Sequence, residues 1–170
     1  MTTKTITGWR FQASLRGPIL HDYEVYGGAF KGHARQTSWF DVRRRDDSLT
    51  IRNPTCAKDL SHVPPVAGCS CGLYAWTHRS PWNAQAMRLM SGIATALLLE
   101  VTAAVHDSSW TDFWDERRTS FRAKELRVTR VWGGPWAARL IAPEWWPVPF
   151  ERVPRLSDLI DEVIPELVIA

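Results

Sequence analysis

Apolar and polar residues alternate in short runs near the start of the chain, which is the pattern of half-buried strands. Aromatic and β-branched residues occur in each run, and turn residues such as Gly27-Gly28 separate the runs. The predicted strands are 8–15, 21–26 and 37–42. Together they predict a β meander over residues 1–55.

A charged run follows the third of these strands. Three arginines at positions 43–45 precede Asp46 and Asp47. Charges of both signs between two apolar runs predict the tip of a hairpin, with a further strand at 49–52.

Residues 73–90 carry apolar positions at spacings of three and four, which predicts helical structure. Pro81 lies inside this segment and is expected to break it in two, because proline lacks the N–H that a helix interior uses. Ser80 is then placed to cap the second piece, with Pro81 in its first turn.

The segment 93–105 is the most apolar run of the chain. Its threonines and valines favour a buried strand, although its alanines and leucines suit a helix as well. Residues 121–132 fit a half-exposed strand with a change of register between Val128 and Val131. The charged, tryptophan-bearing segment 108–119 is expected to be an insertion carried on this strand pair. Residues 93–132 are therefore predicted to be β structure.

The last part of the chain, 133–170, is rich in tryptophan and proline at first and amphipathic at its end. The first half predicts an irregular segment that wraps around the sheet. Ser157 is expected to cap a short helix that Pro165 ends. The residues predicted to face inward on this helix are Leu159, Ile160 and Val163.

Length and composition place these elements in one domain. The chain has 170 residues, 45% of them apolar and 23% charged, which is enough to bury a core without metal or disulfide. We expect a single α+β domain over residues 1–170, with a mostly antiparallel sheet. One or two short helices should follow the Cys-x-Cys element at 69–71, and an irregular C-terminal segment should end in a short helix. No apolar run reaches the length of a membrane span and no apolar leader precedes the first strand, so a cytoplasmic location without a membrane partner is expected.

Candidate metal chemistry is concentrated in residues 56–72, which hold all three cysteines. Thiolate and imidazole are preferred ligands of structural zinc, and Gly68 and Gly72 would let the backbone turn tightly around the metal. The candidate ligands are Cys56, His62, Cys69 and Cys71. The spacing departs from the usual Cys-x-x-Cys pairs, so the alternative stays open that the thiols pack as small buried hydrophobes.

Three short motifs resemble a family of small proteins from actinobacteria and their phages. The motifs are Gly8-Trp9-Arg10, Cys69-Ser70-Cys71-Gly72-Leu73-Tyr74-Ala75 and Phe121-Arg122-Ala123-Lys124. They occur in the family's order over residues 8–132, and the Cys-x-Cys-Gly-x-Tyr-Ala element is the specific part. The resemblance implies a phage or prophage-like origin in an actinobacterial host, and it implies no activity.

A metal-dependent hydrolase is one alternative function. A hydrolytic metal site needs an open coordination position and a general base, and Glu100 and His106 are the groups near apolar sequence that could converge on a pocket. A closed shell of four protein ligands would leave no such position. The chain also contains no Gly-rich phosphate loop, nucleophile elbow or His-Glu-x-x-His motif.

Arginines beside tryptophans make nucleic-acid binding another alternative. Guanidinium groups bind phosphates and aromatic rings stack on bases, so such a face would hold a single strand. The arginines concerned are Arg43, Arg44, Arg45, Arg117, Arg118 and Arg122. Acidic residues lie among them and the net charge is +3, which also fits a solvated, salt-bridged surface.

Ten tryptophans against three tyrosines exceed what the core of a small domain needs. Tryptophan and arginine are enriched at the hot spots of protein interfaces. The candidate partner-binding residues are Trp110, Trp114, Trp145 and Trp146. Alternatively, these rings hold the tail on the sheet or mediate self-association. The favoured function is a non-enzymatic module that binds and modulates a host or phage protein.

Overall fold

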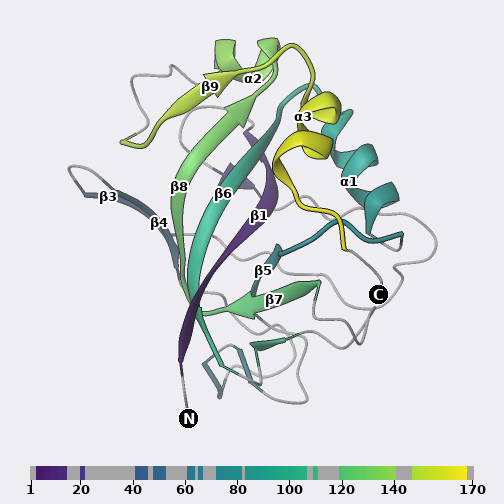
Figure 1. The fold of residues 1–170 in the computed structure, drawn as a ribbon. Coiled ribbons are helices and arrows are strands. Elements are labelled where there is room, and N and C mark those ends of the chain that lie inside the picture. Colours follow the sequence, from purple (N-terminus) through teal and green to yellow (C-terminus); the bar gives the residue numbers. More distant parts are fainter. Residues whose placement is uncertain are drawn as a thin grey trace.

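A computed structural model describes most of the chain and defines an α+β fold, as the sequence predicted. The described residues are 3–14, 20–21, 41–45, 48–52, 61–63, 65–66, 72–81, 83–106, 109–110, 119–140 and 147–167. They form a mostly antiparallel sheet accompanied by short helices (Figure 1).

The elements follow one another along the chain with the helices between strands or after them. The strands are β1 (Lys4–Ser14), β2 (Leu20–His21), β3 (Asp41–Arg45), β4 (Ser48–Arg52), β5 (Leu73–Trp76), β6 (Ala96–Val105), β7 (Ser120–Ala123), β8 (Leu126–Gly133) and β9 (Phe150–Arg152). The helices are α1 (Ala84–Ser91), α2 (Pro135–Leu140) and α3 (Leu156–Val163).

The strand order across the sheet is β3-β4-β8-β6-β1-β5-β7, with β2 paired to β1 and β9 paired in parallel to β8. The central pair is β1 and β6, whose register runs from Lys4 opposite Val105 to Ala13 opposite Ala96. The meander predicted for residues 1–55 holds only for the neighbouring pairs β1–β2 and β3–β4, because β1 lies mainly between β6 and β5 and β4 pairs with β8. Most of the predicted strands 21–26 and 37–42 lies outside the described residues. The apolar run 93–105 supplies the central strand β6, as expected for a strand that is buried on both faces.

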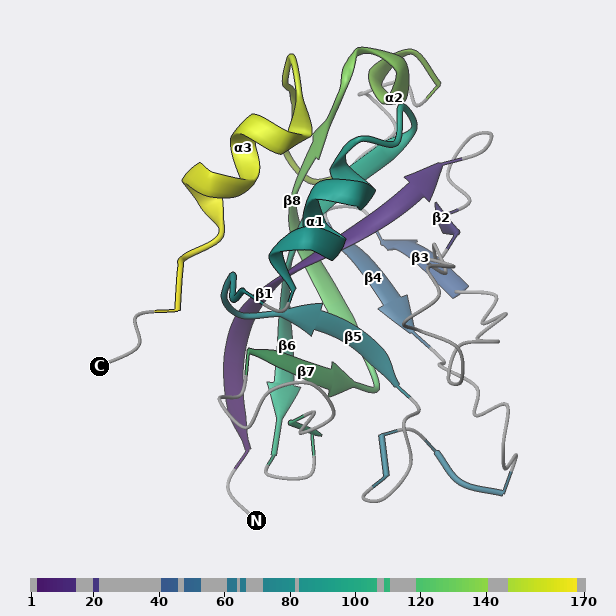
Figure 2. The ribbon, with the colours of Figure 1, turned by 90° about the vertical axis from the view of Figure 1, so that its right-hand side faces the viewer.

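Residues 73–76 form strand β5 and not the predicted helix. Leu73 and Ala75 are buried while the residues between and after them are half-buried, an alternation of period two. β5 meets β1 where Trp9 lies opposite Trp76, and it pairs with β7 along its length. In Figure 2, β5 and β7 cross the long strands, so the sheet curls at this edge.

Two apolar clusters pack on the two faces of the sheet. On one face, called here the inner face, Leu97, Leu99 and Val101 of β6 meet apolar residues of β4, β5, β7 and β8. On the opposite, outer face, Leu98 belongs to a cluster that includes Phe11 and residues of α1 and α3. Figures 1 and 2 show α1 and α3 on the same side of the sheet.

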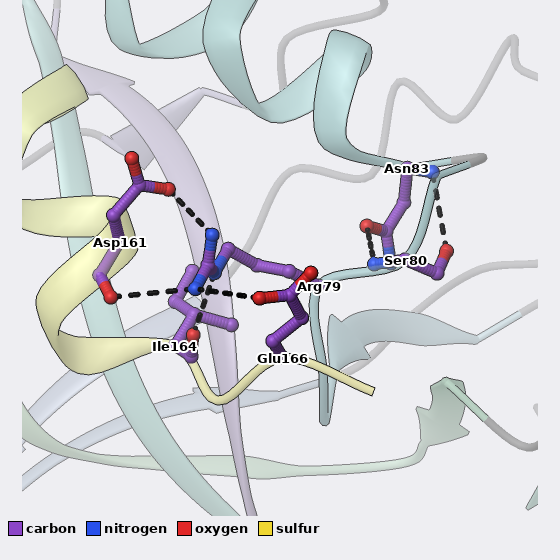
Figure 3. Close-up of polar contacts among 6 residues, drawn as sticks. All are labelled: Arg79, Ser80, Asn83, Asp161, Ile164 and Glu166. Carbon is purple, nitrogen blue, oxygen red and sulfur yellow. Dashed lines mark hydrogen bonds and ion pairs between the residues drawn. The ribbon is translucent and has the colours of Figure 1, made fainter. Parts of the chain in front are cut away.

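Helix α1 is preceded by a reciprocal capping arrangement (Figure 3). The Ser80 N–H donates to Asn83 Oδ1 at 2.7 Å, and the Asn83 N–H donates to Ser80 Oγ at 3.3 Å. The Ser80 carbonyl also accepts the N–H of Ala84 at 2.9 Å. A turn containing Pro81 therefore starts at Ser80, but α1 itself begins at Ala84 with Asn83 as its N-cap, three residues after the predicted cap.

Arg79 ties the region before α1 to the C-terminal segment (Figure 3). Its Nη1 donates to Asp161 Oδ1 at 2.6 Å, and its Nε donates to the Ile164 carbonyl at 2.8 Å. Its backbone N–H donates to the Pro165 carbonyl at 2.7 Å, and its carbonyl accepts the Leu167 N–H at 2.9 Å. Through these bonds, Glu166 after α3 pairs with Arg79 in an isolated parallel β-bridge.

Helix α3 starts one residue earlier than its predicted cap. Arg155 has an extended backbone and precedes the helix, so Ser157 is the second helical residue. The predicted inward face is confirmed, since Leu159, Ile160 and Val163 all pack in the outer-face cluster.

Two further predictions need correction. Residues 121–132 form two strands: β8 pairs with β6, as expected for the strand pair, whereas β7 pairs with β5, so the segment 108–119 leads from β6 to a strand that is not its partner. The tail after residue 133 is also more regular than expected, because it contains α2 and β9. Pro135 follows two glycines and occupies the first helical position, a favourable place for proline.

Candidate functional site

The predicted zinc ligands fall mostly outside the described residues. Cys56, Cys69 and Cys71 lie outside them, and His62 is described as a half-buried residue in a bend. In the described part of the chain, no group of three or more His, Cys, Asp or Glu side chains is arranged to hold a metal ion. The zinc site therefore stays a prediction.

The end of the cysteine segment makes the tight turn that was expected at Gly72. The backbone φ of Gly72 is +125°, a conformation that residues other than glycine rarely adopt. A Cβ at this position would lie 3.1 Å from the Arg122 Cβ and 3.3 Å from the Pro65 Cβ. Gly72 thus packs between Pro65 and β7.

Of the four predicted partner-binding tryptophans, the structure describes only Trp110. Trp110 is half-buried, packs against the inner-face cluster and forms an edge-to-face pair with Phe121 at 6.4 Å between ring centroids. It also forms an antiparallel bridge to Phe121, so its ring closes the core at this end of the sheet. Trp114, Trp145 and Trp146 lie outside the described residues.

Of the predicted nucleic-acid arginines, only Arg122 has a described side chain. Arg122 is only 6% exposed, so its inclusion in a surface is wrong. Arg43, Arg44 and Arg45 lie in β3, which pairs with β4 as the hairpin predicted for this region. In the register, Arg43 lies opposite Thr50 and Arg44 opposite Leu49, so successive positions alternate between the two sides of the sheet. Arg117 and Arg118 lie outside the described residues.

Glu100 and His106 do not converge on a pocket. Glu100 lies within β6 and its Oε1 accepts a hydrogen bond from the Thr129 hydroxyl at 2.6 Å. His106 follows the end of β6, and its N–H donates to Ser109 Oγ at 3.2 Å. Six residues of strand separate the two by about 20 Å, which is too far for one catalytic site.

A β-bulge at Thr129 creates an exposed basic surface that the sequence pattern did not reveal. Glu100 lies opposite Arg130 and Val101 lies opposite Val128, which leaves Thr129 as an extra residue in β8. This bulge is the register change predicted for this strand. It brings both Arg127 and Arg130 to the outer face, although strict alternation would separate residues three apart.

The interior holds a cation as well. Arg10 is 7% exposed on the inner-face side of β1, and its Nη1 donates to the Tyr74 carbonyl at 2.6 Å. Burial lowers the pKa of the Arg10 guanidinium to about 10. The side chain is therefore charged at neutral pH and fastens β1 to β5.

The most exposed large ring of the described residues is on α2. Trp136 is 59% exposed, while the adjacent Ala137 is fully buried in the inner-face cluster. The Arg139 guanidinium carbon lies 5.5 Å from the Trp136 ring centroid, within cation–π range. Sequence reasoning missed this site by treating the segment as irregular, although Gly133-Gly134-Pro135 is a recognisable helix start.

In comparisons with known proteins, the chain matches no protein-family model, no curated protein and no solved structure. Among the described residues, no helix is both long and apolar enough to cross a membrane.

Proposed function

We propose that this protein is a non-enzymatic module that binds a host or phage protein, and that Trp136 on α2 is the centre of its binding surface. The observation that carries the proposal is the exposure of this ring on a helix anchored by a fully buried neighbour, Ala137. A large ring held on a fixed helix loses little conformational freedom when a partner covers it.

Arg139 defines the chemistry of the partner. Its guanidinium lies over the Trp136 ring, so an aromatic surface and a positive charge are presented together. A fitting partner has an apolar pocket for the indole and a carboxylate at the rim of that pocket. Tryptophan and arginine are the residue types most enriched at such hot spots.

The motif resemblance supports an actinobacterial host or phage protein as the partner. A zinc held by Cys56, His62, Cys69 and Cys71 would be a structural part of this module. It would hold the segment before β5 in place and take no part in binding.

Affinity capture from an actinobacterial lysate tests the proposal, with wild type, Trp136→Ala and Leu89→Ala as baits. Leu89 is the matched control because it is 58% exposed on α1 and Trp136 is 59% exposed on α2. We expect Trp136→Ala to lose a partner that wild type and Leu89→Ala both retain. Retention of every partner by folded Trp136→Ala contradicts the proposal.

A further inference from the structure

The outer face of the sheet carries a second surface, far from α2 in the strand register. Thr102 of β6 lies opposite Arg127 of β8, and Thr7 of β1 lies opposite Thr102. Arg127 and Thr7 are exposed and Thr102 is half-buried. Phe11, Leu98 and Trp132 of this face pack against α1 and α3, whereas Ala104 beside these positions is exposed, so this end of the face is open.

The row of paired positions Thr7, Thr102 and Arg127 continues from β8 into β4 and β3. Arg127 lies opposite Thr50, and Thr50 lies opposite Arg43. Neighbouring strands are about 4.8 Å apart, so positions 127 and 43 are about 10 Å apart across the sheet. Thr50 itself is 8% exposed, so the accessible donors among the described side chains are on β8 and β1.

Positive positions outnumber negative ones on this side of the sheet. By register and alternation, the arginine positions are 43, 45, 52, 127 and 130, and the acidic positions are 41, 100 and 151. The Glu100 carboxylate already accepts the Thr129 hydroxyl at 2.6 Å. In the described part of the chain, no carboxylate forms an ion pair with Arg127 or Arg130.

We propose that this basic face binds the phosphate backbone of double-stranded DNA without reading its sequence. Guanidinium and hydroxyl groups are the side-chain donors that contact phosphate oxygens, and Arg127 and Thr7 present both. Among the described residues of this face, the rings of Trp9, Phe11 and Trp132 pack in the outer-face cluster, and none of them is exposed for an unpaired base to stack on. Duplex DNA, with one charge per about 1.7 Å of its axis, is therefore favoured over a single strand.

The bulge at Thr129 is the structural basis of the face. If the same sequence paired in strict alternation without a bulge, Thr129 would face outward and Arg130 would turn toward the inner-face cluster, where Val131 now packs. The Arg130 guanidinium instead lies 5.4 Å from the Trp132 ring centroid on the outer side. The two arginines thus reach one side of β8 from positions three residues apart.

Fluorescence anisotropy with a labelled 20-base-pair duplex tests the proposal on the full chain. We expect Arg127→Gln/Arg130→Gln to weaken binding about tenfold at 50 mM salt and to reduce the log–log salt slope by about 2. Arg152→Gln removes an exposed arginine from β9 and should bind as wild type does. If the double variant does not fold, Arg127→Gln alone leaves the Arg130–Trp132 stack intact and should reduce the slope by about 1.

Three results would overturn the proposal: no binding of duplex by wild type, an unchanged slope in the folded arginine variants, or tighter binding of a 20-nucleotide single strand than of the duplex. Trp136→Ala separates this surface from the protein-binding surface. It should retain full DNA affinity, and a loss would place both activities on one surface and overturn the assignment to the sheet face.

Discussion

Arg79 Nη1 lies 2.6 Å from Asp161 Oδ1, a contact between residues 82 positions apart in the chain. The Arg79 side chain is 20% exposed and also donates to the Ile164 carbonyl, whereas the Asp161 side chain is 64% exposed. The arginine therefore contributes mainly through the backbone it holds, and the carboxylate contributes little because solvent screens it.

The first prediction concerns this contact. Arg79→Ala should lower the free energy of unfolding by about 1–2 kcal/mol, because it leaves the Ile164 carbonyl without its donor. Asp161→Asn should cost less than about 1 kcal/mol. Urea denaturation of the two variants measures both values, and equal losses would show that the ion pair and not the backbone contact holds α3.

The second prediction concerns two glycines. A Cβ at Gly8 would lie 2.6 Å from Phe121 Cε1 and 2.9 Å from the Trp76 carbonyl, whereas a Cβ at Gly134 has nothing within 4 Å. Gly8→Ala should destabilise the fold by about 1–3 kcal/mol through overpacking, and Gly134→Ala should change stability by less than about 0.5 kcal/mol. Thermal denaturation compares them, and a tolerated Gly8→Ala would contradict the close packing of β1 on β7.

The third prediction concerns pH and Arg10. Burial lowers the folded pKa of Arg10 to about 10, below its value in the unfolded chain, so the unfolded chain binds more protons once the pH passes about 9. Stability relative to Arg10→Met should be constant below about pH 9 and should rise by about 1 kcal/mol by pH 11. Urea titrations of both proteins from pH 8 to 11 measure the difference, and a constant difference would mean that burial does not shift this group.

The fourth prediction concerns the cysteine segment. Cys69→Ser and Cys71→Ser should each release zinc and lower the melting temperature, because each removes one of four ligands. His33→Ala should do neither. Elemental analysis of the untagged protein together with thermal denaturation checks this, and equal small effects of all three changes would favour thiols that merely pack.

Much of the sheet follows from local pattern. β6 was predictable because its run of apolar residues suits a strand covered on both sides, and the register change in β8 because Leu126, Val128 and Val131 break the period of two. The inner-face and outer-face clusters confirm both assignments. Strand β6 and the register change in β8 could be predicted because both depend on the order of apolar and polar residues within a single segment.

Pairings between distant segments were not predictable in the same way. Residues 73–76 have helical spacing in sequence, yet they form a strand because β1 and β7 offer hydrogen-bond partners on both sides. The basic face was missed for a related reason. Arg127 and Arg130 share a side only because of the bulge, and Arg43 joins their row only through the pairing of β3 with β4 and β4 with β8.

The most direct test of the protein-binding function is the dissociation constant of the captured partner, purified, for wild type, Trp136→Ala and Leu89→Ala. Trp136→Ala should bind about 30-fold more weakly, the effect of losing a hot-spot ring, while Leu89→Ala should match wild type. Equal affinities of wild type and folded Trp136→Ala would contradict a binding surface centred on α2.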